Sequence, residues 1–355
     1  MSRLTRIAAL AAALIMGGQA LAADPVKVGF VYVGPVGDHG WSYQHDHARK
    51  ALEEKFGDKI TTAFVEDVAE GADSERVINQ FAQQGYDLIF TTSFGFMNPT
   101  LKVAKRFPKA KFEHATGYKR ADNLATYAAR FYEGRAIIGT IAGHMTKSNV
   151  IGYVAPFPIP EVVRGINAFT IALREVNPKA EVKVIWTNSW YDPGREREAA
   201  ETLIAQGADI ITQHTDSPAP VQVAQEKGVK AFGQASDMSR FGPDAHLTAI
   251  VDDWVPYYTA RVQAVMDGTW ASADTWGGLA SGMVVMAPYA NMPDEVKAAA
   301  EQMEEAIRSG KHHPFQGPIK NQAGDVVVKE GEVVPDEKLL SMDWYVEGVQ
   351  GKLPK

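Results

Sequence analysis

Short, almost continuous apolar runs alternate with segments of helical spacing along the first part of the chain. Residues 26–33 form such a run, as expected of a strand buried on both faces of a parallel sheet. Ala48, Leu52 and Phe56 then recur every four residues, which predicts a helix. The same alternation predicts strands over 60–65, 88–92 and 111–115, and helices over 75–84 and around Val103 and Phe107. Strand and helix in turn are typical of βαβ units and a doubly wound parallel sheet.

The pattern starts again near residue 150. Strands are predicted over 150–154, 182–186, 210–212 and 229–232, and helices over 196–205, 221–226 and a segment that carries Val163, Ile166, Phe169 and Leu173. Segments 83–89 and 205–211 resemble each other, because each has a glycine, Gly85 or Gly207, placed to end a helix before a buried strand. The sequence therefore predicts one architecture used twice.

No Pro- or Ser-rich linker separates the two halves, which are joined by an apolar, helix-like stretch over 135–145. Later segments are expected to return to the first half, so that several crossovers form a hinge with a ligand cleft between two lobes. We predict an α/β protein of two doubly wound parallel-sheet lobes. The N-terminal lobe is expected to hold 23–131 with about 252–282, and the C-terminal lobe 132–251 with about 283–345. Ligands of open α/β sheets bind beyond the carboxyl ends of the strands.

The first 22 residues have the layout of a cleavable secretory signal peptide. Arg3 and Arg6 precede an apolar run over 7–16, which is too short to span a membrane. Ala20-Leu21-Ala22 provides the small residues that a signal peptidase cuts after, so we expect cleavage after Ala22 and a periplasmic protein. A buried first helix is the alternative. The absence of cysteine excludes a lipidated N-terminal Cys and hence a lipoprotein.

Composition narrows the classes of partner and chemistry. Hydrophobic residues make up 45% and charged residues 22% of the chain, as in an ordinary soluble globular protein. The net charge of -7, without a long basic run, argues against nucleic acid as a partner. The chain has no thiolate nucleophile, disulfide or zinc–thiolate site. His39, His45 and His47 cluster in the sequence but not on one helical face, so we predict a solvated helix face there and no metal site.

Enzyme signatures are missing from the sequence. It has no Gly-x-Ser-x-Gly elbow, no His-Glu-x-x-His motif and no P-loop. Gly34, Gly37 and Gly40 follow the first predicted strand, but their Gly-x-x-Gly-x-x-Gly spacing differs from a dinucleotide-binding loop. We therefore expect no cofactor and no catalytic activity.

A set of short motifs, in a fixed order, carries a family resemblance. They are Gly-Asp-His-Gly-Trp at 37–41, Thr-Ser-Phe-Gly-Phe at 92–96, Glu133-Gly134, Ser-Trp-Tyr-Asp-Pro at 189–193, Gln-Gly-Ala-Asp at 206–209, Ser236-Asp237, Gly242-Pro243-Asp244 and Gly277-Gly278-Leu279. Over essentially all of the chain after residue 22, the sequence resembles the basic-membrane-protein family of ABC-transporter substrate-binding proteins, similar to its purine nucleoside-binding PnrA-like members. The resemblance implies a type I periplasmic binding protein fold, a small-molecule ligand, an inner-membrane ABC permease as partner and a monomer.

The resemblance also implies a set of binding residues. Trp41 and Trp190 match the family aromatics that sandwich the purine ring, a geometry suited to stacking on both faces of a flat heterocycle; the alternative is that each indole plugs its own loop. Ser93 and Phe94 follow a predicted strand and can offer backbone N–H groups to a ligand, or Ser93 can cap the next helix. Asp38 and Asp216 either accept from a ligand N–H or cap a helix, which for Asp38 begins near Ser42.

Departures from the family pattern bear on the ligand. Nucleoside binders of the family have an acidic residue at Ala235, a lysine at Asp252 and an acidic residue at Thr116, and the first two of these hold the ribose hydroxyls. A site without those partners discriminates poorly for a sugar. The resemblance thus implies a purine base or another small flat heterocycle, with Gln234 as an amide donor and acceptor for its edge.

Thr116, Asp237 and Asp252 complete the residues expected to bind ligand. A nucleoside-binding member of the same family and an exported nucleoside-processing enzyme are the alternatives, and a sensor that presents ligand to a membrane receptor shares the fold.

Overall fold

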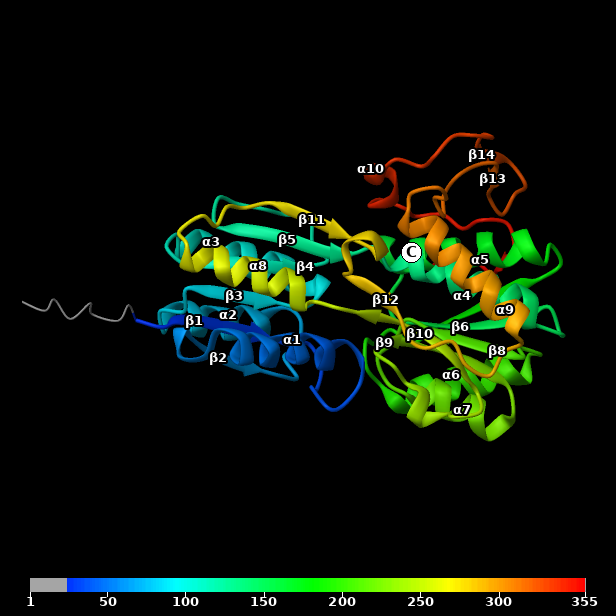
Figure 1. Ribbon diagram of the computed structural model, residues 1–355, viewed down its shortest axis with the longest axis horizontal. Coiled ribbons are helices and arrows are strands. Elements are labelled where there is room, and N and C mark those ends of the chain that lie inside the picture. Colours follow the sequence, from blue (N-terminus) through cyan, green and yellow to red (C-terminus); the bar gives the residue numbers. More distant parts are fainter. Residues whose placement is uncertain (1–23, 355) are drawn as a thin grey trace, which may run out of the picture.

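The computed structural model describes residues 24–354 and has two large sheets, each covered by helices on both faces; their strand pairs are parallel except β12, which pairs antiparallel with β10 at one edge of the second sheet. The predicted signal peptide lies outside the described residues. Figure 1 shows the two lobes end to end along the long axis of the molecule. Within the described chain, no helix combines the length and apolar character that a membrane span needs.

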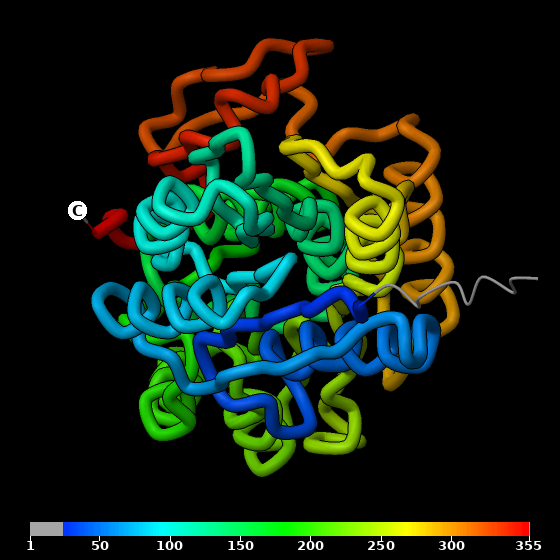
Figure 2. Tube along the Cα trace, turned by 90° about the vertical axis from the view of Figure 1, so that its left-hand side faces the viewer, coloured from blue at the N-terminus to red at the C-terminus, as the bar shows by residue number. Residues whose placement is uncertain are grey.

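The N-terminal lobe is built on a six-stranded sheet of order β11-β5-β4-β3-β1-β2, in which every strand pair is parallel. Its strands are β1 (Val26–Val31), β2 (Ile60–Val65), β3 (Leu88–Thr91), β4 (Lys111–Ala115), β5 (Leu124–Ala129) and β11 (Asp274–Gly277), and its helices are α1 (Gly40–Phe56), α2 (Ala72–Gln83), α3 (Met97–Arg106) and α8 (Val255–Met266). Figure 2 shows α1 and α8 on one side of this sheet and α2 and α3 on the other.

The C-terminal lobe is built on a seven-stranded sheet of order β12-β10-β9-β8-β6-β7-β15. Its strands are β6 (Val150–Ala155), β7 (Glu181–Trp186), β8 (Ile210–Gln213), β9 (Lys230–Ala235), β10 (His246–Asp252), β12 (Val284–Met286) and β15 (Val349–Gln350), and its helices are α4 (Phe131–Met145), α5 (Pro160–Val176), α6 (Pro193–Ala205), α7 (Ala219–Lys227) and α9 (Asp294–Arg308). A C-terminal segment with β13 (Ile319–Lys320), β14 (Val326–Val328) and α10 (Asp336–Leu339) lies on this lobe (Figure 1).

Alternation along the buried strands explains the layers. In β1, Val28 and Phe30 point into the core that contains α1 and α8, whereas Val31 points into the core that contains α2 and α3. Successive side chains of a strand face opposite sides, so a strand between two helical layers must be apolar throughout. The continuous apolar run predicted a doubly covered sheet, and the structure confirms it.

The repeated helix ends are also confirmed. Gly85 and Gly207 follow α2 and α6 with φ of 74° and 99°. After each glycine, the next backbone N–H donates back into the helix, from Tyr86 to Phe81 O at 3.2 Å and from Ala208 to Leu203 O at 3.1 Å. A glycine tolerates this left-handed conformation without the steric cost of a Cβ, so it ends both helices in the same way.

The described chain passes between the sheets between β5 and α4, between β10 and α8, and between β11 and β12. Backbone hydrogen bonds tie these crossovers together, from Arg130 N to Gly277 O at 2.6 Å and from Asp253 N to Met283 O at 3.2 Å. Several crossing segments side by side are typical of a hinge between lobes. The lobe boundaries within these loops stay a prediction.

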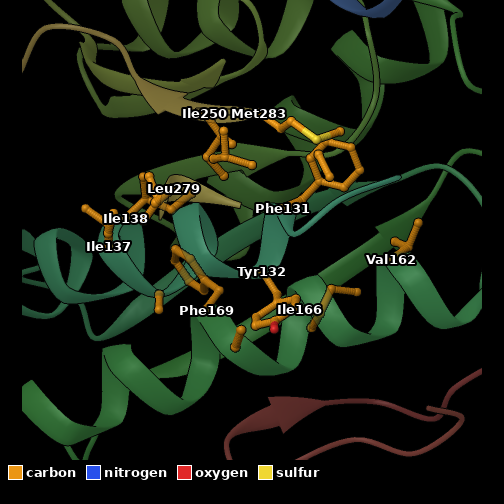
Figure 3. Packing of buried hydrophobic residues seen from close by; sticks show 14 of the residues in the cluster. Phe131, Tyr132, Ile137, Ile138, Val162, Ile166, Phe169, Ile250, Leu279 and Met283 are labelled. Atoms are coloured by element: carbon orange, nitrogen blue, oxygen red, sulfur yellow. The ribbon is translucent and has the colours of Figure 1, made fainter. Parts of the chain in front are cut away.

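Close helix packing supports the C-terminal lobe beside the crossovers. A Cβ on Gly139 of α4 would lie 2.3 Å from the carbonyl oxygen of Phe169 in α5, so only glycine permits this approach. Figure 3 shows side chains of α4, such as Phe131 and Ile138, between those of α5 and those of the crossover segments, Ile250, Leu279 and Met283. The hinge region therefore rests on one continuous apolar core.

Candidate functional site

A cavity lies between the two lobes, beyond the carboxyl ends of their strands. It holds about 360 Å³ of empty space, its mouth included. Its lining residues are Val33, Trp41, Ser93, Phe94 and Thr116 from the N-terminal lobe, and Glu161, Trp190, His214, Asp216 and Gln234 from the C-terminal lobe. This is the edge where open α/β sheets bind ligands.

Trp41 is held firmly by its own surroundings. It lies in the first turn of α1, and its indole Nε1 donates to the carbonyl oxygen of Thr92 at 2.6 Å. Its ring packs edge-on against His45 at 4.5 Å and Trp254 at 5.6 Å between centroids. An aromatic fixed on its edges presents a preformed apolar face.

Trp190 is attached more loosely, in the loop between β7 and α6. Its ring lies 5.3 Å from that of Phe157, and its backbone oxygen accepts from the N–H of Asp216 at 3.0 Å. Its Nε1 donates to Glu70 of the other lobe at 3.2 Å. The two indoles of the cavity thus come from opposite lobes.

Gln234 has a fixed orientation at the end of β9. Its Oε1 accepts from a guanidinium N–H of Arg135, a fully buried residue of α4 that also donates to the carbonyl oxygen of Gln213 at 2.8 Å. Arginine has no acceptor, so the amide oxygen must face it. The sequence predicts Gln234 as both donor and acceptor for a ligand; its oxygen already accepts from Arg135, and its contact with a ligand stays a prediction.

Asp216, His214 and Glu161 form the polar wall of the cavity. Burial raises the pKa of the Asp216 carboxyl well above its usual range, and the carboxyl of Glu196 raises it further. The His214 Nε2 lies 3.7 Å from Glu161 Oε1, and burial lowers the pKa of that imidazole. A neutral carboxyl can donate one hydrogen bond and accept others, which suits the mixed edge of an uncharged heterocycle.

Ser93, Phe94 and Thr116 reach the cavity from strand ends of the N-terminal lobe. The Ser93 hydroxyl donates to Glu70 Oε1 at 2.5 Å and makes no helix cap, so the capping alternative for Ser93 is wrong. Thr116 has a φ of 62°, and Ala235, at the end of β9, has 61°. Such strained residues cluster where a fold must aim its backbone at a site. Phe94, Thr116 and Glu161 also border a wider neighbouring groove of about 1170 Å³.

Three predicted site residues do not line the cavity. Asp38 is exposed and pairs with Arg240 and with the Nδ1 of His39 at 2.7 Å; it does not cap α1, whose N-terminal residue has no side-chain cap. Asp237 is 45% exposed and accepts from the N–H of Ser239 at 2.9 Å. Asp252 is buried behind the wall, and neither carboxyl oxygen has a partner. The contact of these three residues with a ligand stays a prediction. In this structure Asp38 and Asp237 have protein partners, and Asp252 is buried outside the cavity lining.

The comparisons with known proteins agree with this geometry. The family described as ABC transporter substrate-binding protein, PnrA-like, matches residues 25–321. The chain belongs to this family. A purine-binding protein of Brucella abortus is 58% identical to it over 98% of this chain and the whole of that protein. A Haloferax volcanii protein named as a candidate ABC transporter glucose-binding protein is 40% identical over 95% of this chain and 84% of its own length.

Solved structures place this substrate-binding protein among type I periplasmic binding proteins. A solute-binding protein from Aeropyrum pernix has a TM-score of 0.70 at 19% identity, over 84% of this chain and 93% of its own. One from Conexibacter woesei has a TM-score of 0.64 at 22% identity, over 81% and 98%. The predicted family and fold are confirmed. Proteins of this class are extracytoplasmic, bind small molecules and work with ABC permeases.

The lobes of this substrate-binding protein touch across the cavity mouth. The Gly40 N–H donates to the Ser236 hydroxyl at 2.7 Å, and the His39 and Phe241 rings meet edge-to-face at 5.0 Å. The exposed Asp38–Arg240 pair adds a charged contact between the same segments. These contacts are those of a closed form, in which the cavity is covered.

The predicted solvated helix face around His39, His45 and His47 is wrong for His45. His45 is fully buried, because its face of α1 packs on α8, where its Nδ1 lies 2.5 Å from the Tyr258 hydroxyl and its ring stacks on Trp254 at 4.9 Å. His47 is exposed, as predicted. Among residues 24–354, no three histidine or acidic side chains are grouped to hold a metal ion.

Sequence reasoning missed Glu161 and His214. Glu161 stands in the first turn of α5, where an acidic residue is common because it complements the helix dipole, so nothing marks it as a site residue. His214 directly follows β8, and its place at a strand end beside the predicted Asp216 is the signal that could have revealed it.

Asp252→Asn should make the ligand-free protein more stable at neutral pH. Burial raises the pKa of Asp252 well above the value of about 3.9 that it has in an unfolded chain, and Glu161 and Asp216 raise it further against the opposing effect of Arg135. As the pH rises from about 4 to this raised pKa, the unfolded chain releases the proton while the folded protein keeps it, so folding stability falls. An amide cannot ionise and removes that loss.

Thermal unfolding between pH 4 and pH 8 measures this effect. We expect the variant to be more stable than the wild type at pH 8 and to gain progressively less toward pH 4. The exposed Asp122→Asn serves as the control and should change nothing. A gain that is the same at every pH, or a loss at pH 8, would contradict the buried neutral carboxyl.

Proposed function

We propose that this substrate-binding protein captures a purine base between Trp41 and Trp190 in the periplasm and delivers it to an inner-membrane ABC permease. The observation that carries the proposal is a covered cavity lined by two indoles from opposite lobes. Closure would bring one ring to each face of a flat ligand, which is the favourable geometry for stacking. The purine-binding relative at 58% identity supports the same ligand class.

The polar wall supports an uncharged base. The Gln234 amide offers a donor, and the raised pKa of Asp216 favours its neutral carboxyl form, which can donate to a ring nitrogen and accept from an N–H. Asp216 follows β8 and Gln234 lies at the end of the neighbouring strand β9, so the two side chains could form hydrogen bonds with adjacent atoms on one edge of a purine. Ala235, at one of the two family positions that hold a ribose, has only a methyl group, and Asp252, at the other, does not line the cavity, so neither offers a partner for the hydroxyls of a ribose.

Adenine should bind more tightly than adenosine, and the same order should hold for guanine and hypoxanthine against their ribosides. Isothermal calorimetry with these six compounds measures it, and we expect at least a tenfold preference, about 1.4 kcal/mol, for each base. Glucose belongs in the panel because one relative is named for it. Tighter binding of the ribosides would favour the nucleoside-binding alternative, and glucose binding alone would overturn the proposed ligand.

Three further measurements test the rest of the proposal. Incubation with inosine and adenosine should leave both intact; their turnover would favour an exported nucleoside-processing enzyme. Intact-mass measurement of the exported protein should give a chain beginning at Ala23 with no lipid, and size-exclusion chromatography should give a monomer.

A further inference from the structure

Glu70 receives three hydrogen bonds on one carboxylate oxygen. Its Oε1 accepts from the Ser93 hydroxyl at 2.5 Å, from the backbone N–H of Gly95 at 3.1 Å and from the Trp190 Nε1 at 3.2 Å. Ser93 and Gly95 belong to the same lobe as Glu70, whereas Trp190 belongs to the other. A Cβ on residue 95 would lie 2.1 Å from the Glu70 carboxyl carbon, so glycine there makes room for the carboxylate.

The two cavity indoles differ in what fixes them. Trp41 donates to a backbone oxygen of its own lobe and packs edge-on against the stacked rings of His45 and Trp254. Trp190 has one ring neighbour, Phe157, and in the described structure the hydrogen bond of its indole goes to Glu70 across the cleft. Opening of the lobes would leave the contacts of Trp41 in place but would break the bond between Trp190 and Glu70.

We infer that Glu70 is a positioning residue for the indole of Trp190, holding that ring over the ligand only when the lobes are closed. Glu70 does not line the cavity, so it acts through Trp190 rather than on the ligand. The Ser93 and Gly95 donors fix the carboxylate in advance, and a charged acceptor strengthens the bond to the indole. This inference rests on the proposed stacking of the ligand against Trp190.

The bond exists only in the closed form, so its loss should speed ligand release and leave association nearly unchanged. In stopped-flow fluorescence with adenine as the probe, we expect Glu70→Ala to raise koff about tenfold and to change kon less than twofold. Glu70→Gln keeps an acceptor and should recover most of the slow release. Asp73→Ala is the matched control, because it removes a nearby carboxylate that pairs with Arg76 at 2.6 Å on the same helix.

A double-mutant cycle isolates the contact. Trp190→Phe keeps a stacking ring without the N–H, and in that background Glu70→Ala should change koff less than twofold. An unchanged tenfold effect there would overturn the inference, since Glu70 would then act through the Ser93 loop. A Glu70→Gln variant as fast as Glu70→Ala would overturn it too, because the acceptor alone would not suffice.

The indole N–H signals in NMR give a second readout on adenine-saturated protein. Glu70→Ala should shift the Trp190 signal, identified by its loss in Trp190→Phe, and leave the Trp41 signal in place. If adenine does not bind the wild type, the proposed function fails. If adenine binds and Trp190→Ala weakens that binding, but the double-mutant cycle shows no coupling, then only the role of Glu70 fails.

Discussion

Trp41→Ala should weaken adenine binding by about tenfold to a few hundredfold. A stacked aromatic pair contributes about 0.5–1.5 kcal/mol beyond the burial of its area, and the lost burial of the indole against the ligand adds to that. Because Trp41 is already held by Thr92, His45 and Trp254, the wild-type ring is in place before the ligand arrives. The loss should therefore appear in the association and the dissociation rates alike.

The same substitution should lower the melting temperature, since it leaves a cavity beside Trp254 and His45. Trp190→Ala is the informative comparison, because it should weaken adenine binding by a similar factor. It should hardly lower the melting temperature, since the indole of Trp190 packs on one aromatic ring, that of Phe157, and its loss disturbs little of the protein interior. Trp41→Phe should retain most of the affinity. Calorimetry at a temperature where all variants are folded decides it, and full adenine affinity in Trp41→Ala would refute the stacking role.

Much of the fold could be predicted because it is encoded locally. The apolar strands β1, β3, β6 and β8 and the glycines that end α2 and α6 each reveal themselves within about ten residues. For the later part of the chain the sequence predicts only the lobe, the first for about 252–282 and the second for about 283–345, and not the neighbouring elements. Strand β11 pairs with β5 some 150 residues earlier, and α8 packs on α1; nothing in the local pattern of 255–286 specifies those distant partners.

The residues of the candidate site could also be predicted in part, whereas the contacts that some of them make could not. The family resemblance implies Trp41, Trp190, Thr116 and Gln234, and positions after predicted strands favour Ser93, Phe94 and Asp216; the structure brings all seven to one cavity. Asp38 and Asp237 stand in equivalent loops but turn to Arg240 and to the Ser239 N–H. The turn of Asp38 depends on Arg240 of the other lobe, as the partnership of Glu70 depends on Trp190, whereas Asp237 turns to a backbone N–H two residues along its own loop.

Closure of the lobes depends on the absence of a side chain at Gly40. This residue begins α1 with a φ of 81°, and a Cβ placed on it would lie 2.7 Å from the backbone oxygen of Asp216 in the other lobe. A backbone oxygen cannot give way as a flexible side chain can, so Gly40→Ala should hold the lobes apart. Because only the closed form holds the ligand between both lobes, the apparent affinity of the protein for its ligand falls when the closed form is less populated. We expect adenine to bind at least tenfold more weakly.

Gly37→Ala separates this clash from backbone strain. Gly37 lies in the same loop with a φ of 49°, but a Cβ there would meet nothing within 4 Å. Both variants carry the strain of a left-handed alanine, about 1 kcal/mol, and only Gly40→Ala meets the opposite lobe. Small-angle scattering should show adenine reducing the radius of gyration of the wild type and of Gly37→Ala, but not of Gly40→Ala. If Gly40→Ala contracts as fully as Gly37→Ala, the contact between Gly40 and Asp216 does not govern closure, and the tight binding must arise within one lobe.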